Sequence, residues 1–229
     1  MVRRTKADAL VPRNSLLDAA EHLFQAHGVS RTSLNDIAVA AGTTRGAIYW
    51  HFKDKADLFN AMMERVILPL EGALACAAGK AEAATNPLLS LRDSMMNALR
   101  QTATDDQTRR VFEVATHKVE YVSEMQAVRD RHLQVRNQCV AMTEKALREV
   151  VRREDIKLAM PLPTAALGLH VIMDGLIQNW LLDPLAFDLE KSGRHTMDAY
   201  LTGLGFTLPT PRAPQRAPRK PPTAQPAPA

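Results

Sequence analysis

Cysteine, glycine and aromatic residues are all scarce in this chain of 229 residues. Its two cysteines, Cys76 and Cys139, show no metal-binding or disulfide spacing, which argues against a disulfide-stabilised fold and favours a reducing compartment. Only 10 residues are glycine and 5% are aromatic, whereas Ala, Leu, Met, Glu and Arg abound, so the composition favours helix over sheet. We therefore expect an all-α fold, with room for two modest domains or one large one.

Long apolar segments are also missing. No uninterrupted apolar run reaches the roughly 18 residues that a membrane span needs. At the N-terminus, Arg3, Arg4 and Lys6 are followed by Asp8 and not by an apolar core, which is not the pattern of a signal peptide. We expect a cytoplasmic protein with no membrane partner.

The formal net charge of +4 is concentrated at the two ends of the chain. Residues 1–60 contain eight Lys or Arg against six Asp or Glu, and residues 209–229 contain four against none. The segment between them carries a small negative excess. A basic end on a neutral to acidic body is compatible with binding to an anion such as DNA.

Residues 32–55 carry two helix-start signals close together. Ser33 and Asp36 have the spacing of a capping box, which predicts a short helix that ends near Gly42. Thr43 and Thr44 can cap a second short helix directly after it. Two short helices joined by a turn of three or four residues that contains glycine are typical of a helix-turn-helix unit.

The second short helix carries side chains suited to reading DNA. Arginine can form a fork on a guanine edge, glycine lets the backbone approach closely, and polar side chains can donate to phosphates. The predicted DNA contacts are Thr32, Ser33, Thr43, Thr44, Arg45, Gly46, Tyr49, His51 and Lys55. The large aromatics Trp50 and Phe52, taken singly, are expected in the core because such side chains are usually buried.

This stretch resembles the DNA-binding domain of TetR-family transcriptional regulators. The resemblance rests on Thr32, Asp36-Ile37-Ala38, Ala41-Gly42, Arg45-Gly46, Ile48-Tyr49, His51-Phe52, Lys55 and Leu58. Residues 1–6 and 44–52 look closer still to the subgroup that represses multidrug efflux pumps, the AcrR and TtgR type. The resemblance implies a homodimeric repressor, not an enzyme, that needs no cofactor. It would bind double-stranded operator DNA and leave it when a small lipophilic effector binds the C-terminal domain.

The rest of the chain predicts about nine helices in total, arranged in four segments. These are a flexible basic arm at 1–11, the helix-turn-helix DNA-binding domain at 12–53, the ligand-binding and dimerisation domain at 54–206, and a disordered proline-rich tail at 207–229. Residues 123–152 alternate apolar spacings of three and four, which predicts a long helix packed antiparallel against neighbours, or alternatively a self-standing coiled coil. By the resemblance, helices at about 164–182 and 188–204 would form the dimer interface.

One predicted helix carries a polar stripe through otherwise apolar sequence. His170, Asp174 and Gln178 lie four residues apart, and a charge there is costly unless it is paired or faces a wet cavity. A core hydrogen-bond network or a pairing at the dimer interface is the alternative interpretation. By the resemblance, Asp174 and Gln178 align with pocket positions that anchor ligands.

The expected pocket is rich in methionine, whose flexible thioether chains adapt to varied apolar molecules. At two positions Phe112 and Thr116 replace the amide and the histidine of the TtgR pattern, so we expect a more apolar site. The predicted ligand contacts are Val66, Leu91, Met95, Ala98, Leu99, Phe112, Glu113, Thr116, His117, Met173, Asp174, Ile177 and Gln178.

Two other functions are compatible with the sequence. Glu113 with His117, and His170 with Asp174, are pairs four residues apart that could converge on a metal in a helical metalloenzyme. The repeated Glu-x-x-His pattern of di-metal bundles is absent, so the main prediction includes no metal and no catalytic residue. A TetR-type protein could instead activate transcription or sense an endogenous metabolite.

Overall fold

The structure, a computed structural model, describes residues 13–79 and 86–208. Within these ranges it contains nine α-helices, a short 3-10 helix and no strand, which confirms the predicted all-α fold. The predicted basic arm at 1–11 lies outside the described residues, and so does the predicted tail from residue 209 onward.

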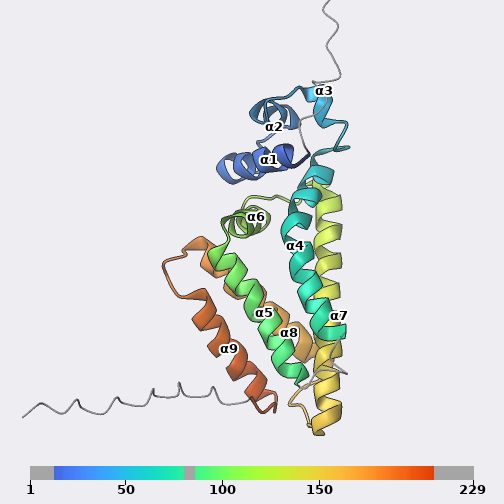
Figure 1. Cartoon of the computed structure of the whole chain (residues 1–229), viewed down its shortest axis with the longest axis vertical. Coiled ribbons are helices and arrows are strands. Elements are labelled where there is room, and N and C mark those ends of the chain that lie inside the picture. Colours follow the sequence, from blue (N-terminus) through green and yellow to red (C-terminus); the bar gives the residue numbers. More distant parts are fainter. Residues whose placement is uncertain (1–12, 80–85, 209–229) are drawn as a thin grey trace, which may run out of the picture.

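Three short helices form a head at one end of the molecule (Figure 1). They are α1 (Arg13–His27), α2 (Leu34–Ala40) and α3 (Arg45–Ile48). The predicted capping box is present at the start of α2: the Ser33 hydroxyl accepts from the Asp36 amide at 3.2 Å, and the Asp36 carboxylate accepts from the Ser33 amide at 2.9 Å. The helix boundaries of the head therefore follow from local side-chain chemistry.

The hydrophobic core of the head extends into two further helices. Helix α4 (Lys55–Gly79) contributes Phe59 and Met62, and α6 (Asp106–His117) contributes Val111 and Val114; each of these side chains is at most 1% exposed. Burying such side chains contributes roughly 1.5–3 kcal/mol each. The head is thus held to the rest of the molecule by shared core packing.

Helices α4 and α7 (Gln126–Glu154) lie side by side and run away from the head in the same direction (Figure 1). Arg131 on α7 fixes their alignment, because it pairs with Glu64 at 3.9 Å and with Glu71 at 3.6 Å, both on α4. The predicted antiparallel packing is therefore wrong for this pair. In the sequence between α4 and α7, helices α5 (Pro87–Thr104) and α6 bring the chain back to the head, so α7 also starts there.

Helix α4 continues through Pro69. Proline has no amide hydrogen, so the carbonyl of Arg65 loses its usual partner four residues along the helix. The residues before Pro69 include Met62 and Val66 of the head core, whereas Leu74 after it packs against the core of the body. Pro69 thus lies close to the point where α4 passes from the core of the head to the core of the body.

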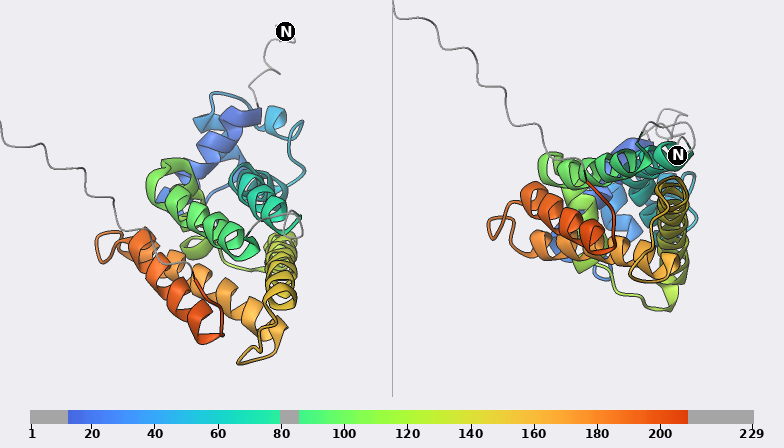
Figure 2. Two further views of the ribbon diagram at one scale, coloured as in Figure 1. Left: turned by 60° about the horizontal axis from the view of Figure 1, so that its bottom comes forward. Right: turned by 90° about the horizontal axis from the view of Figure 1, so that it is seen from below.

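The second core belongs to the body, where α5 (Pro87–Thr104), α8 (Leu162–Leu182) and α9 (Leu189–Gly203) pack with the end of α7. Figure 2 shows α8 and α9 side by side, next to α5. The guanidinium of Arg92 on α5 donates to both carboxylate oxygens of Asp198 on α9, at 2.6 and 2.7 Å. Such a bidentate pair fixes orientation as well as distance.

Helix α8 is, by length and composition, the one described helix that could cross a membrane. Two of its large side chains, Leu169 and Trp180, are buried in the core of the body. Three others are exposed: Leu167 at 45%, Val171 at 58% and Leu182 at 70%. Their spacing places them on one face of the helix, so α8 has a covered side and an uncovered apolar side.

Candidate functional site

The turn between α2 and α3 has the geometry that a helix-turn-helix unit requires. Gly42 has φ +73°, a left-handed conformation that glycine adopts without strain. Thr44 caps α3, since its hydroxyl accepts from the Ala47 amide at 3.3 Å. Beyond α3 the chain continues in turns, and the Phe52 amide bonds to the Ile48 carbonyl at 3.0 Å.

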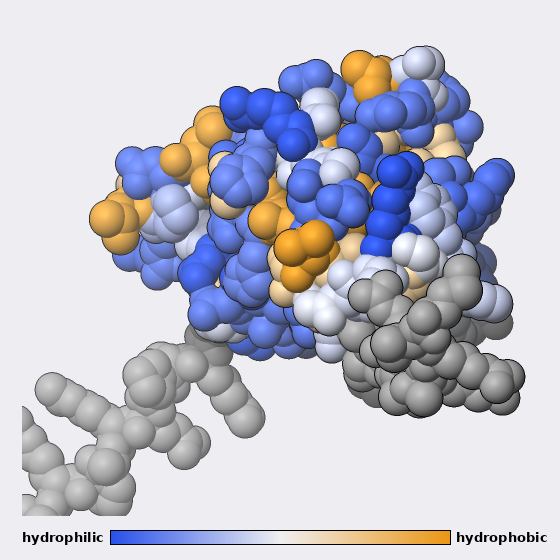
Figure 3. Space-filling model, turned by 90° about the horizontal axis from the view of Figure 1, so that it is seen from above, coloured by the Kyte–Doolittle hydropathy of each residue, from blue (hydrophilic) through white to orange (hydrophobic). Residues whose placement is uncertain are grey.

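Most of the predicted DNA contacts lie on the outer surface of the head. Ser33, Thr44, Arg45 and Gly46 are exposed, Tyr49 is 48% exposed, and Thr43 and His51 are half-buried. The guanidinium carbon of Arg45 lies 6.0 Å from the centre of the Tyr49 ring, so the cation stacks on the aromatic face. Figure 3 looks onto this end of the molecule and shows a mainly hydrophilic surface with separate apolar patches.

The side chains of two predicted DNA contacts have partners within the structure instead. Thr32 is 2% exposed, and its hydroxyl donates to the Gly28 carbonyl at 2.9 Å. The ammonium of Lys55 donates to the Val29 carbonyl at 3.1 Å and pairs with Glu124 at 3.1 Å, with its side chain 17% exposed. Both side chains therefore have a structural role in and beside the head.

Trp50 corrects a third expectation, because it is 83% exposed and not a core residue. Phe52 is buried as expected, at 2%. Ile48 and Phe52 are four residues apart and share the inner face, which puts Trp50, halfway between them, on the opposite face. The exposure of Trp50 could therefore have been predicted from its spacing to Ile48 and Phe52.

A cavity of about 240 Å³ lies in the body, between α4, α7, α5, α6 and α8. Its wall is mostly apolar. The predicted ligand contacts that line it are Met95, Ala98, Phe112, Thr116, Met173, Asp174 and Ile177. The prediction thus identified the α5, α6 and α8 sides of the cavity.

The other predicted ligand contacts do not line this cavity, and the apolar ones are core residues. Val66 belongs to the core of the head, and Leu91 to the core of the body. Leu99 is fully buried against α9, where a Cβ built on Gly193 would lie 2.1 Å from the Leu99 Cδ1 atom. These assignments were wrong because the rotation of each helix about its axis is set by tertiary packing.

The remaining three are polar and have partners elsewhere. The Glu113 carboxylate accepts from the side-chain amide of Gln25 at 2.7 Å. His117 Nε2 lies 3.2 Å from the backbone carbonyl of Gln178, and the side-chain amide of Gln178 donates to the Asp174 carboxylate at 2.5 Å. No group of three His, Cys, Asp or Glu side chains among the described residues is arranged to hold a metal. The helical metalloenzyme hypothesis therefore gains no support from these pairs.

The wall residues that the sequence did not indicate lie mainly on α4 and α7. They are Phe59, Asn60, Met63, Ile67, Leu70, Glu71, Leu74, Val128, Arg131, His132, Val135, Arg136, Cys139 and Thr143. Helical spacing within each helix indicated which residues share a face. Nothing in the sequence indicated that the two faces would meet.

A polar group occupies one part of the cavity wall. The Tyr121 hydroxyl lies 2.9 Å from His132 Nδ1. Burial and the charge of Asp174 raise the pKa of Tyr121. Burial lowers the pKa of His170, although Asp174 opposes this effect, so the imidazole is neutral at pH 7. The polar stripe predicted on α8 thus contributes His170 and Asp174 to the cavity.

We expect Cys139 to resist alkylation in the folded protein. Burial, with a smaller contribution from the charge of Glu71, raises the pKa of its thiol to about 11, whereas Cys76 is exposed. Because only the thiolate reacts, iodoacetamide at about pH 8 should label Cys76 at least about tenfold faster than Cys139. Peptide mass spectrometry measures both rates, and the urea-unfolded protein, in which the two should react alike, is the control. Equal rates in the folded protein would contradict the prediction.

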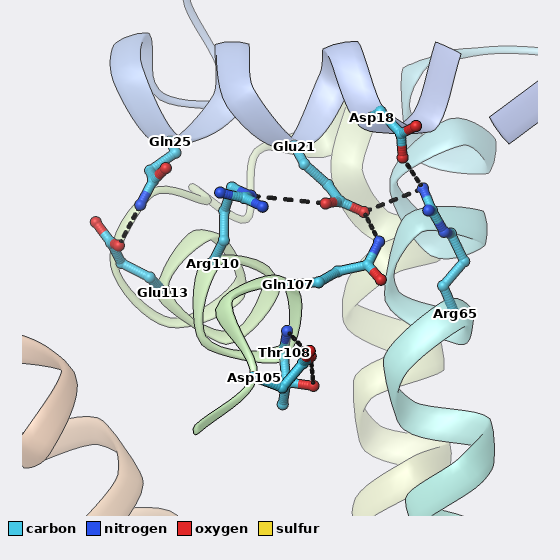
Figure 4. Close-up of polar contacts among 9 residues, drawn as sticks. All are labelled: Asp18, Glu21, Gln25, Arg65, Asp105, Gln107, Thr108, Arg110 and Glu113. Carbon is cyan, nitrogen blue, oxygen red and sulfur yellow. Dashed lines mark hydrogen bonds and ion pairs between the residues drawn. The ribbon is translucent and has the colours of Figure 1, made fainter. Parts of the chain in front are cut away.

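Helix α6 contacts the head through a buried carboxylate (Figure 4). Glu21 of α1 is 2% exposed and accepts from the Gln107 amide at 3.0 Å. It also lies 3.2 Å from the Arg65 guanidinium and 3.7 Å from that of Arg110. Burial raises the pKa of Glu21, and the amide and both arginines oppose this shift. The carboxylate therefore depends on partners from α4 and α6.

The same helix reaches the cavity with its other side chains. Phe112 and Thr116 line the cavity, whereas Gln107 and Glu113 bond to α1. The chain just after α6 also bonds to the head, since the Lys118 carbonyl accepts from the Val29 amide at 3.0 Å. A displacement of α6 by a molecule in the cavity would therefore act on α1.

A helix-turn-helix head that shares α4 and α6 with a helical body defines the class of two-domain helix-turn-helix transcriptional regulators. The chain belongs to the TetR family. Residues 16–62 match the family model described as bacterial regulatory proteins, tetR family. Residues 86–206 match the model of the C-terminal region of MAATS-type transcriptional repressors. The predicted family membership is confirmed.

The chain is also similar to repressors of efflux pumps. It is 37% identical over 220 residues to the HTH-type transcriptional regulator AcrR of Shigella flexneri, covering 93% of this chain and 98% of AcrR. The crystal structure of NalD, the secondary repressor of the MexAB-OprM multidrug efflux pump in Pseudomonas aeruginosa, matches with a TM-score of 0.75 and 33% identity, over 84% of this chain and 96% of NalD. A SmeT–triclosan complex matches with a TM-score of 0.74 and 30% identity, over 83% of this chain and 90% of SmeT.

Proposed function

We propose that this protein is a cytoplasmic, homodimeric repressor of a multidrug efflux operon, released from a palindromic operator when a lipophilic molecule fills the cavity. The similarity to AcrR, NalD and SmeT supports the repressor role. The triclosan bound by SmeT supports an effector with an apolar body.

Each head would place α3 in a major groove of double-stranded DNA. The exposed side chains of Arg45 and Tyr49 would face the bases, and Thr44 would donate to phosphate. Two heads related by a two-fold axis would contact half-sites about one helical turn apart. A palindromic operator follows from this symmetry.

The uncovered side of α8 supports the proposed dimer. Leu167, Val171 and Leu182 are exposed on one face of the helix, and Leu185 just beyond it is 95% exposed. Exposed apolar side chains that gather on one face of a helix are suited to an interaction site. Pairing of α8 and α9 with the same helices of a second copy would bury it in an isologous interface.

The observation that carries the proposed release mechanism is the double contact of α6. Its Phe112 lines the cavity, and its Gln107 bonds to the buried Glu21 of the head. A ligand shifts the protein away from DNA only if it binds the DNA-free arrangement more tightly. Insertion of a ligand beside Phe112 would favour an α6 position in which the heads no longer match both half-sites.

Operator release by triclosan tests this function. Operator DNA is first selected from random duplexes with the purified protein, and fluorescence anisotropy then follows binding during a triclosan titration. We expect a palindromic selected sequence and release of the DNA by triclosan. Asp174→Ala should weaken the response to triclosan and leave operator affinity unchanged, because Asp174 lines the cavity and is not part of the head.

Two outcomes would contradict the proposal. One is the absence of any selected consensus, and the other is a protein–DNA complex that triclosan, lipophilic antibiotics and plant phenolics all leave intact. If Asp174→Ala lost both operator affinity and response, Asp174 would have a folding role.

A further inference from the structure

Glu71 has an unusual position in the wall of the cavity. It lies on α4 beyond Pro69, with its side chain 14% exposed, and its Oε2 atom is 3.6 Å from the Arg131 guanidinium. Its other oxygen, Oε1, is buried and has no hydrogen-bond partner among the residues that the structure describes. A buried acceptor without a donor is rare in proteins because it loses its hydration without compensation.

The cation that pairs with Glu71 is shared with a second carboxylate. Arg131 is shared between two carboxylates, since it also lies 3.9 Å from Glu64. One guanidinium therefore serves two anions at distances longer than a good charge-assisted hydrogen bond. A donor that reached Oε1 from the cavity would be held by a carboxylate that Arg131 only partly neutralises.

The other carboxylate of the wall is less suited to this role. Asp174 is exposed, and it already accepts a hydrogen bond from Gln178 at 2.5 Å. Water can satisfy its remaining capacity without a ligand. The buried oxygen of Glu71 is thus the better anchor.

The rest of the cavity suits an apolar ligand. Leu70, Leu74, Val135 and Ile177 line it with apolar surface. An apolar cavity of about 150 Å³ is known to accept benzene. At about 240 Å³, this cavity is larger, so it has room for an aromatic ring with further apolar groups.

We propose that Glu71 Oε1 anchors effectors that combine a compact apolar body with a hydrogen-bond donor, either a phenolic hydroxyl or a protonated amine. This inference rests on the proposed function in taking the cavity as the effector site. It adds the selection rule: a donor at one end of the molecule, and no requirement for an acceptor.

Three probes with the same apolar body test the rule by isothermal titration calorimetry on the full chain at about neutral pH. They are para-butylphenol, para-butylbenzylamine and para-butylanisole, of which the ether has no donor. We expect the phenol and the amine to bind at least about tenfold more tightly than the ether, because hydrogen bonds to a charged group are stronger than neutral ones.

Two variants of Glu71 separate the donor effect from the charge effect. Glu71→Met removes the acceptor at nearly constant length and should abolish the preference, while Arg131 retains Glu64 as a partner. Glu71→Gln keeps an acceptor without the charge, so it should preserve the preference for the phenol and reduce that for the amine. Glu64→Gln is the control, because Glu64 shares Arg131 with Glu71 but does not line the cavity, and it should leave the order of affinities unchanged.

The inference is overturned if the ether binds as tightly as the phenol, if Glu71→Met keeps the wild-type order, or if none of the probes binds. Operator binding by the same samples, measured by anisotropy, shows that each variant is folded. If the probes bind in the expected order and the operator is not released, the proposed release mechanism fails and the assignment of Glu71 stands.

Discussion

Replacing Arg45 with alanine should weaken operator binding by about 5- to 150-fold, equivalent to about 1–3 kcal/mol. Arg45 is the first residue of α3, it is exposed, and it stacks on Tyr49, which limits the positions of its guanidinium. A fork held in this way can donate two hydrogen bonds to the O6 and N7 atoms of a guanine. Fluorescence anisotropy at fixed salt measures the loss.

Two further variants show whether Arg45 reads a base. Arg45→Lys keeps the charge and loses the fork, so it should bind nearly as weakly as the alanine variant if the contact is to guanine. Arg148→Ala is a control for loss of positive charge, because Arg148 is exposed near the end of α7 remote from the head. Wild-type affinity in Arg45→Ala would reject a role in DNA binding, and full rescue by lysine would indicate a phosphate contact.

Phe59→Ala should lower the free energy of unfolding by about 3–5 kcal/mol, the usual cost of removing a buried phenylalanine ring. Phe59 is 1% exposed, and its ring centre lies 6.0 Å from that of Phe24 in the core of the head. It also lines one end of the cavity. Its removal would leave a void where head and body meet, and urea denaturation measures the change.

The matched control is Leu68→Ala on the same helix. Leu68 is 52% exposed, so its truncation should change the free energy of unfolding by less than about 0.5 kcal/mol. All variants must be compared at one protein concentration, because the proposed dimerisation would contribute to apparent stability. A loss below about 1 kcal/mol in Phe59→Ala would mean that the site collapses around the void and that head and body do not share a rigid core.

The parts of the fold that the sequence predicted well depend on chemistry within a few residues. Ser33 with Asp36 fixed the start of α2, and Thr44 fixed the start of α3. A cap is decided by side chains that reach amides two or three positions away. Such signals are visible without any knowledge of tertiary structure.

The parts that the sequence did not predict depend on how helices face one another. On α5, Met95 and Ala98 line the cavity whereas Leu91 and Leu99 do not, although all four are apolar and closely spaced. Apolar composition identifies a buried residue but not the neighbour that buries it. The rotation of α5 against α8 and α9 decides the difference.

The expected polarity of the cavity was incomplete for the same reason. Phe112 does make the α6 wall apolar. The α4 and α7 walls, which meet because the two helices lie side by side, add Glu71, Arg131 and Arg136. The polar part of the cavity wall therefore depends on the pairing of α4 with α7, which the sequence did not predict.

The proline within α4 has a mechanical consequence. Because Pro69 leaves the carbonyl of Arg65 without its usual amide, this point of the long helix bends at lower energetic cost than the turns around it. A displacement of the part of α4 after Pro69 would then be divided between bending at the proline and rotation of the part of α4 that packs in the head. The flexibility of α4 at Pro69 would therefore decide how much of a small displacement in the body reaches the head.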